Sequence, residues 1–264
     1  MPATTPERQA SPARPPRRVG VIGCGRIAAP VAQALHAGEV AGWALGGVLA
    51  RSRRTIGAIA VTDDVEAFLR AGFDLIVEAA GPSALASLGE PALLAADVWT
   101  VNGTALADGQ LAARLEAACR RGGHRLRLVP GAIAGLDGIA LAAWDPKATL
   151  HVAVHTPDAA RAGEPTVTAG DPRAAFAGSV REAAGRYPEG VNVAVAAAWA
   201  GPGLERTTVA VRHTAGEHRL AIEATGRYGR VRAALEPGGD PDWHPVAASL
   251  LACLRRETLA IWAG

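Results

Sequence analysis

The fold is decided near the start of the chain by a glycine-rich stretch, Val19-Gly20-Val21-Ile22-Gly23-Cys24-Gly25-Arg26-Ile27-Ala28. Its first part is apolar and predicts a strand, and its last part predicts the start of a helix. The pattern Gly-x-Gly-x-x-Ala joins the two. In such a turn Gly23 permits the tight bend, Gly25 lets a pyrophosphate approach the backbone, and Ala28 lets the helix pack closely on the strand.

The helix N-terminus in this stretch adds N–H donors and a dipole that favours an anion. The stretch therefore predicts a dinucleotide-binding turn, and the alternative is a tight turn with a purely structural role. The residues expected at the cofactor are Gly23, Gly25, Arg26, Ile27 and Ala28.

Downstream of this turn, short apolar runs alternate with amphipathic stretches. The runs predict strands at residues 19–22, 45–49, 74–77, 98–101 and 125–129, and the stretches predict helices at 26–37, 64–70, 83–95 and 108–121. Alternation of this kind is typical of an α/β domain with a parallel sheet covered by helices on both faces. We therefore expect a Rossmann-type, doubly wound domain.

The pattern of apolar and polar residues changes after Gly131. A helix is expected at residues 138–143, with Asp137 as its cap, followed by runs with strand periodicity at 151–155, 207–212, 218–224 and 229–235. They predict a second α+β domain with a mostly antiparallel sheet, and residues 245–263 predict one final helix. The expected organisation is a flexible tail at 1–18, a dinucleotide-binding domain at 19–130, a catalytic and dimerisation domain at 131–242, and a C-terminal segment at 243–264 that packs back on the first domain.

Composition excludes several classes of protein. The 27 basic and 25 acidic residues leave a net charge of +2, without the basic stripe interleaved with aromatic residues that nucleic-acid binding needs. No apolar run reaches the roughly 18–20 residues of a membrane helix, so we expect a soluble protein without a membrane partner. The three cysteines, Cys24, Cys119 and Cys253, are isolated from one another, which suits the reducing cytoplasm and argues against a metal site.

The end of the second predicted strand bears on the choice of cofactor. An NAD-preferring site places an acidic residue there to bind the ribose hydroxyls, but this chain has Ala50 at that position, followed by Arg51, Ser52 and Arg53. Arginine and serine side chains suit a 2′-phosphate through charge-assisted hydrogen bonds. The sequence thus predicts a preference for NADP(H), with NAD possible; the alternative is a solvated basic loop.

Two further turns follow the strands ending near Val77 and Val101, where the carboxyl ends of parallel strands face a cofactor. Ala79 and Ala80 are expected to contact it. Glu78 has two interpretations, a carboxylate that fixes the loop or a negative charge at a helix N-terminus.

The chain also carries the segment Gly131-Ala132-Ile133-Ala134-Gly135-Leu136-Asp137 and, later, Phe176-Ala177-Gly178-Ser179-Val180-Arg181-Glu182-Ala183-Ala184, Tyr187-Pro188 and Asn192-Val193-Ala194. In these motifs it resembles the L-aspartate dehydrogenase family. The resemblance implies that Ala132 and Asn192 contact the dinucleotide, that His218 is the active-site histidine, and that the protein is a homodimer acting on L-aspartate, or on oxaloacetate and ammonia.

The implied chemistry moves a hydride from the Cα of an amino acid to the nicotinamide and leaves an imine that water attacks. A group with a pKa near neutrality must shuttle protons, and histidine fits this role; His213 is the fallback for His218. An arginine is expected to bind the substrate carboxylates, and the sequence leaves five candidates open: Arg161, Arg173, Arg212, Arg219 and Arg227. Two other functions stay open, an oxidoreductase acting on another small oxo or imino acid and a non-catalytic dinucleotide sensor.

Overall fold

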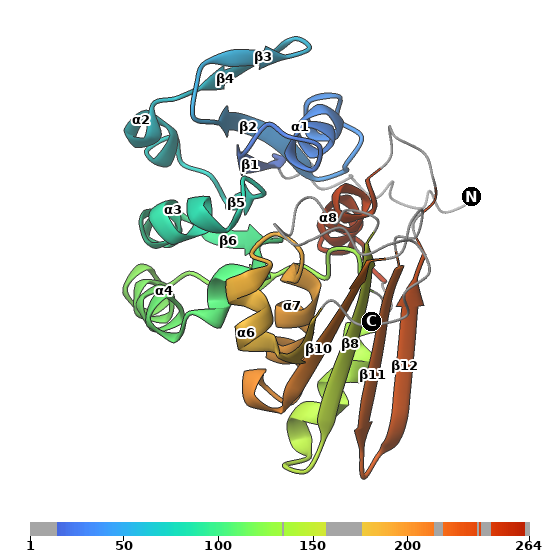
Figure 1. Ribbon diagram of the computed structural model, residues 1–264. Coiled ribbons are helices and arrows are strands. Elements are labelled where there is room, and N and C mark those ends of the chain that lie inside the picture. The colour runs from blue at the N-terminus through green and yellow to red at the C-terminus, as the bar shows by residue number, and fades with distance from the viewer. Residues whose placement is uncertain are drawn as a thin grey trace, which may run out of the picture.

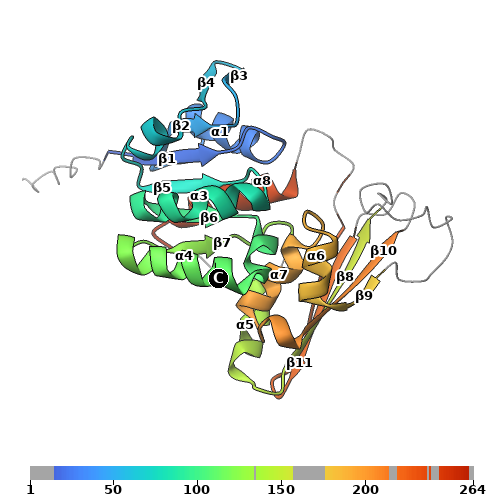
Figure 2. The same ribbon diagram turned by 60° about the vertical axis from the view of Figure 1, so that its left-hand side comes forward.

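The computed structural model describes residues 15–133, 135–156, 176–213, 219–236, 238 and 244–261. Within these residues the chain forms one sheet of seven strands and one of five (Figure 1). The first sheet belongs to the N-terminal half of the chain and the second to the C-terminal half. The helices α6 (Val180–Arg186) and α7 (Asn192–Ala200) lie between them (Figure 2).

The first sheet has the order β3-β4-β2-β1-β5-β6-β7 and is parallel except at its β3 edge. The chain leaves the central strand β1 toward β2 and β4, then returns to the other side of β1 as β5. Ligands of doubly wound sheets bind at such a reversal, outside the carboxyl ends of the strands. The strands are β1 (Arg17–Ile22), β2 (Trp43–Leu49), β3 (Arg54–Ile56), β4 (Ile59–Thr62), β5 (Leu75–Glu78), β6 (Asp97–Thr100) and β7 (Leu126–Leu128).

Helices cover both faces of this sheet, which confirms the doubly wound prediction. On one face an apolar core packs α1 (Ala28–His36) and α8 (Pro245–Arg256) against β1, β2 and β5. On the other face a core packs α2 (Val65–Leu69), α3 (Pro82–Ala95) and α4 (Gly109–Gly122). This second core continues through the 3-10 helix η1 (Gly103–Ala107) and α7 to the inner face of the second sheet. The two halves of the protein thus share apolar packing.

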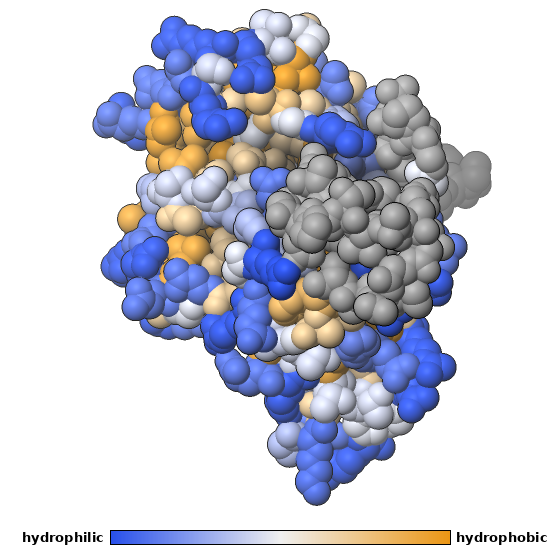
Figure 3. All heavy atoms as spheres, in the orientation of Figure 1, coloured by the Kyte–Doolittle hydropathy of each residue, from blue (hydrophilic) through white to orange (hydrophobic). Residues whose placement is uncertain are grey.

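The second sheet has the order β12-β11-β8-β10-β9, in which only β8 and β10 pair in parallel. The prediction of a mostly antiparallel sheet is confirmed. Its hairpin end, where β11 turns into β12, is largely hydrophilic on the face shown in Figure 3. The elements of this half are α5 (Leu136–Ala140), η2 (Leu141–Trp144), β8 (Thr149–Thr156), β9 (Phe176–Ser179), η4 (Leu204–Arg206), β10 (Thr207–His213), β11 (Arg219–Gly226) and β12 (Gly229–Leu235).

Several boundaries differ from the sequence prediction. Strand β1 begins at Arg17 rather than Val19, because the Arg18 backbone N–H donates to Asp74 and its guanidinium donates to the carbonyls of Ala71 and Gly72. The hairpin of β3 and β4, closed by Gly57 at φ +57°, was not predicted.

Two helix predictions were wrong in detail. Asp137 does not cap a helix at 138–143: α5 begins at Leu136 with Gly135 at its N-cap, and Asp137 lies within its first turn. The final helix ends at Arg256, not at residue 263. It packs against α1, and the Trp43 indole N–H donates to the Leu254 carbonyl over 2.9 Å. In the described part of the chain no helix has the length and apolar character needed to cross a membrane.

Candidate active site at the carboxyl ends of the first sheet

The glycine-rich turn connects β1 to α1 at the reversal point of the sheet. Gly23 has φ +118°, and its N–H donates to the Leu49 carbonyl over 2.8 Å. A Cβ at Gly23 would lie 2.8 Å from the Ala79 carbonyl oxygen and 3.2 Å from the Ala28 Cβ. Only glycine fits both this backbone conformation and this approach to the β5–α3 turn. The β1–α1 and β5–α3 turns therefore lie against each other.

The space in front of this turn is open. A Cβ added at Gly25 would meet no atom within 4 Å. Helix α1 has Ile27 at its N-cap, and among the described residues no side chain makes a capping hydrogen bond to its first backbone N–H groups. Uncapped N–H donors with the positive end of a helix dipole form an anion site. The backbone of Gly25, Arg26, Ile27 and Ala28 thus fits the pyrophosphate of a dinucleotide.

The basic segment after β2 is exposed and partly paired. The Arg53 guanidinium donates to Asp63 over 2.7 Å, and this contact lowers the pKa of the Asp63 carboxyl. The Arg54 guanidinium donates to the Ser52 hydroxyl over 2.9 Å. Arg51 is exposed and makes no such bond within the described residues. Of the predicted phosphate-binding side chains, Arg51 is therefore the most available to a ligand.

Glu78 ends β5 and is 1% exposed. Its carboxylate accepts hydrogen bonds from the Thr100 hydroxyl over 2.6 Å, from the Asn102 amide over 2.8 and 2.9 Å, and from the Ala80 N–H over 2.8 Å. Burial raises the pKa of the Glu78 carboxyl, and these donors oppose the rise because they favour the ionised form. Of the two interpretations of Glu78, the loop-fixing carboxylate is the one that the structure supports.

The residues assigned by resemblance fall in two places. Asn192 begins α7, and its side-chain oxygen accepts from the Thr104 N–H over 2.9 Å, so it lies at the carboxyl end of β6. Ala132 lines a small apolar cavity together with Leu220 and Leu235 of the second sheet. Asn192 thus bonds to a residue two positions after Asn102, which is a partner of Glu78. The described contacts of Ala132 are with the second sheet.

The predicted catalytic residue, His218, lies outside the described residues, as do Arg161 and Arg173. Among the other arginine candidates, Arg227 donates its backbone N–H to the buried Asp145 carboxylate over 2.6 Å at the hairpin end of the sheet, and this bond lowers the pKa of Asp145. Arg227 thus stabilises the turn between β11 and β12. Arg219 pairs with Glu236 at 3.2 Å. Arg212 is exposed and in register with His155 at the other end of the sheet.

Sequence reasoning missed the roles of Thr100 and Asn102. The signal was present, because a polar residue ends each of two neighbouring strands, and Glu78 pairs with Thr100 in the β5–β6 register. Among the described residues, no group of three or more His, Cys, Asp or Glu side chains is arranged to hold a metal ion.

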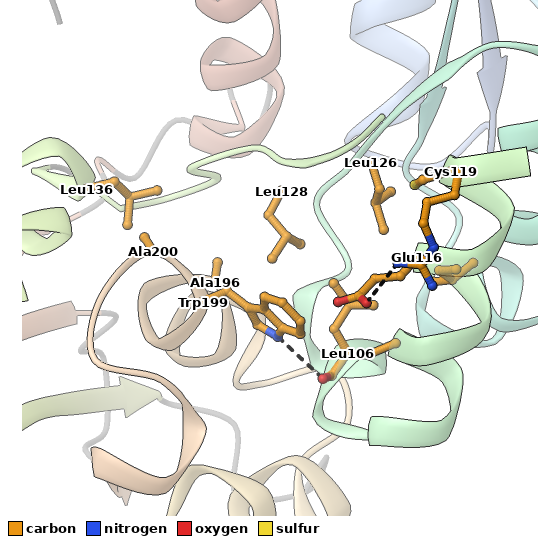
Figure 4. Close-up of a pocket in the computed structure, with 12 residues that line it drawn as sticks. Leu106, Glu116, Cys119, Leu126, Leu128, Leu136, Ala196, Trp199 and Ala200 are labelled. Carbon is orange, nitrogen blue, oxygen red and sulfur yellow. Dashed lines mark hydrogen bonds and ion pairs between the residues drawn. The ribbon is translucent and has the colours of Figure 1, made fainter. Parts of the chain in front are cut away.

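A cavity lies away from the glycine-rich turn. It has a volume of about 460 Å³ and lies between α4, β7 and α7, at the edge of the first sheet (Figure 4). Trp199 and Leu106 line it, and the indole N–H of Trp199 donates to the Leu106 carbonyl over 3.4 Å. Most of its lining is apolar and includes no residue of the glycine-rich turn.

Comparison with known proteins agrees with this geometry. The profile of the homoserine dehydrogenase NAD-binding domain matches residues 23–129, and that of the aspartate dehydrogenase C-terminal domain matches residues 131–256. The crystal structure of aspartate dehydrogenase from Thermotoga maritima superposes with a TM-score of 0.76 at 19% identity, covering 94% of this chain and 99% of that one. It shows the same fold.

Curated relatives are closer in sequence. L-aspartate dehydrogenase 2 of Bordetella bronchiseptica is 36% identical over 261 residues, which cover 91% of this chain and 96% of the relative. L-aspartate dehydrogenase of Ruegeria pomeroyi is 37% identical over 263 residues, covering 92% and 94%. Identity at this level over nearly the whole length shows that the chain belongs to the L-aspartate dehydrogenase family.

Proposed function

We propose that the protein is an NAD(P)-dependent L-aspartate dehydrogenase. It converts L-aspartate to oxaloacetate and ammonia through iminoaspartate, or catalyses the reverse reductive amination. The observation that carries this proposal is 36% identity to an L-aspartate dehydrogenase over 91% of the chain, joined to an open, uncapped glycine-rich turn at the reversal point of the sheet.

When bound, the nicotinamide dinucleotide supplies the hydride acceptor or donor. The chain's own residues hold it in place. The backbone from Gly23 to Ala28 binds the pyrophosphate, the Ala79–Ala80 turn borders the same crevice, and Asn192 approaches from the second domain. By family resemblance Ala132 also contacts the cofactor and His218 exchanges the proton of the reacting substrate.

We propose oxidation of L-aspartate as the direct assay. Purified protein is given NADP⁺ or NAD⁺ with L-aspartate, D-aspartate, L-glutamate or L-alanine, and nicotinamide reduction is followed by absorbance. We expect reduction with L-aspartate, at a kcat/KM at least about tenfold above the other amino acids, because each misplaced or missing carboxylate loses a charge-assisted contact. Reduction with another acid alone would assign the scaffold to a different substrate. Binding of the cofactor without any reduction would indicate a sensor.

We infer a preference for NADP(H). It is supported by the missing acidic residue after β2 and by the exposed guanidinium of Arg51, which makes no bond to another described residue. For Arg51→Ala we expect the Kd for NADPH to rise about tenfold or more while the Kd for NADH changes less than about twofold, because a charge-assisted contact to the 2′-phosphate contributes about 1.5–3 kcal/mol. The Kd is measured by nicotinamide fluorescence.

The matched control for Arg51 is Arg70→Ala, which removes an exposed arginine at the C-cap of α2 that pairs with Glu66. It should change neither Kd. The double variant Arg51→Ala with Arg53→Ala tests whether Arg53 contributes once its bond to Asp63 is lost. Equal weakening of NADPH and NADH binding by Arg51→Ala would contradict the 2′-phosphate assignment.

A homodimer formed by the outer face of the second sheet is also proposed. Five alanines form one row across all five strands in mutual register, and they are Ala234, Ala221, Ala153, Ala210 and Ala177. The adjacent row carries both signs of charge, with Glu223 paired to Arg230 and Arg232. A flat, small-residue row beside mixed charges suits a two-fold interface with itself.

The dimer is tested at the centre of this row. Ala153→Arg is expected to halve the mass measured by light scattering, because each interface would receive two buried, unpaired charges. Ala67→Arg, at an exposed position on α2, should leave the mass unchanged. A wild-type monomer, or a dimer that tolerates Ala153→Arg, would contradict this interface.

We also infer a cytoplasmic location, supported by the free state of Cys24, Cys119 and Cys253.

A further inference from the structure

The second domain makes side-chain hydrogen bonds to the short helix η1 of the first domain. The side-chain oxygen of Asn192 accepts from the Thr104 N–H over 2.9 Å, and the Trp199 indole donates to the Leu106 carbonyl over 3.4 Å. Arg181 donates to the Ala107 carbonyl. Three hydrogen bonds from α6 and α7 thus reach three of the five residues of η1.

The helices η1 and α7 pack closely against each other, without room for a side chain at Gly103. A Cβ at Gly103 would lie 2.7 Å from the Asn192 carbonyl oxygen and 3.3 Å from the Ala196 nitrogen. Gly103 is buried by this packing, and Thr104 beside it is only 6% exposed. Because the backbones are in direct contact, a displacement at the start of η1 is passed to the first turn of α7.

Glu78 fixes the start of this helix. Asn102 is the residue immediately before η1, and both Glu78 oxygens accept from its amide. The same carboxylate accepts the Ala80 N–H over 2.8 Å in the β5–α3 turn, which touches the glycine-rich turn through Ala79. One buried carboxylate therefore joins the turn beside the dinucleotide site to the element that holds the second domain.

We propose that Glu78 is a positioning residue that sets Asn192 and the second domain against the dinucleotide site. This inference rests on the proposed function, in which the relative position of the two domains sets the distance between nicotinamide and substrate. Glu78 does not touch the reacting atoms. It acts through Asn102 and η1, and its effect on turnover should therefore exceed its effect on cofactor affinity.

The test is Glu78→Gln, which keeps the shape of the side chain but places an amide donor among Thr100, Asn102 and Ala80, which all donate to position 78. We expect kcat with oxaloacetate and ammonium to fall about 10- to 100-fold. The Kd for NADPH should stay within about threefold, because the glycine-rich turn is unchanged and the amide oxygen at position 78 can still accept from the Ala80 N–H. Hydrogen–deuterium exchange at residues 101–107 should become faster.

Two further variants separate positioning from general destabilisation. Trp43→Phe removes the bond to Leu254 at the other end of the first domain and should lower Tm without lowering kcat at a temperature where the protein is folded. Glu78→Gln combined with Asn102→Asp reverses donor and acceptor in the pair and should restore part of kcat.

The proposal is overturned if Glu78→Gln lowers kcat no more than Trp43→Phe does, if it lowers only NADPH affinity, or if exchange at 101–107 is unchanged. The exchange measurement needs no substrate. Faster exchange there, in a protein whose wild type does not turn over oxaloacetate, would support the linkage and reject the proposed function alone.

Discussion

Gly23→Ala is expected to weaken NADPH binding by at least about 100-fold and to lower Tm. Alanine at φ +118° is strained by about 1–3 kcal/mol, and its Cβ would lie 2.8 Å from the Ala79 carbonyl oxygen. Relief of this contact separates the β1–α1 and β5–α3 turns, which displaces the N–H donors meant for the pyrophosphate. Binding is measured by nicotinamide fluorescence and Tm by circular dichroism.

Two glycines in the same domain provide matched controls. Gly25→Ala places its Cβ in open space, so the Tm of the free protein should be unchanged within about 2 °C. NADPH binding should weaken about tenfold or more, because the methyl group would stand where we propose that the pyrophosphate approaches. Gly38→Ala has a positive φ of +72° and open space around it, so it should lower Tm and leave NADPH binding intact. Unchanged binding in Gly25→Ala would move the cofactor away from this turn.

His218→Ala is expected to lower kcat for reductive amination about 10²- to 10⁴-fold, the usual contribution of a positioned acid–base group. The Kd for NADPH should stay within about threefold, because the proposed role of His218 is proton exchange with the substrate. Single-turnover absorbance measurements separate the chemical step from product release.

The controls for His218 are two other histidines. His36→Ala removes an exposed side chain at the end of α1 and should leave kcat unchanged. His213→Ala, at the end of β10, tests the fallback assignment. Loss of turnover in His213→Ala together with retention in His218→Ala would show that the family motif is aligned to the wrong histidine.

The sequence was informative where a pattern is local. Periodicity and the glycine-rich turn predicted five strands of the first sheet to within two residues at each end, because their cores are apolar runs. The hairpin of β3 and β4 was missed because three- and four-residue strands at a sheet edge bury few side chains. The final helix was extended too far, since Leu259 and Ile261 continue its apolar pattern, yet they are 43% and 91% exposed.

The site was less accessible to sequence reasoning because it depends on register and on contacts between domains. Glu78 had two equally physical interpretations until the pairing of β5 with β6 placed Thr100 beside it. The bond between Thr104 and Asn192 joins residues 88 positions apart. The resemblance assigned Asn192 to the cofactor, but no local pattern indicates which element of the first domain it meets.

The arginines show the same limit. Five were open as carboxylate receptors, and pairing excludes Arg227, which serves Asp145 at the far end of the sheet. Similarly, Arg53 and Ser52 looked equivalent to Arg51 in the sequence, but each is bonded to a neighbouring side chain. Composition shows how many charges a segment carries, whereas only the fold shows which of them are already neutralised.

Whether the protein catalyses the reductive amination of oxaloacetate is tested by the ammonium dependence of NADPH oxidation. Purified protein is mixed with NADPH and oxaloacetate, with and without ammonium, and absorbance is followed with time; NADH replaces NADPH in a parallel series. An L-aspartate dehydrogenase should give decay that requires both oxaloacetate and ammonium and that yields one L-aspartate for each NADPH consumed. Decay without ammonium, with a hydroxy acid as product, or binding of NADPH with no decay, would contradict it.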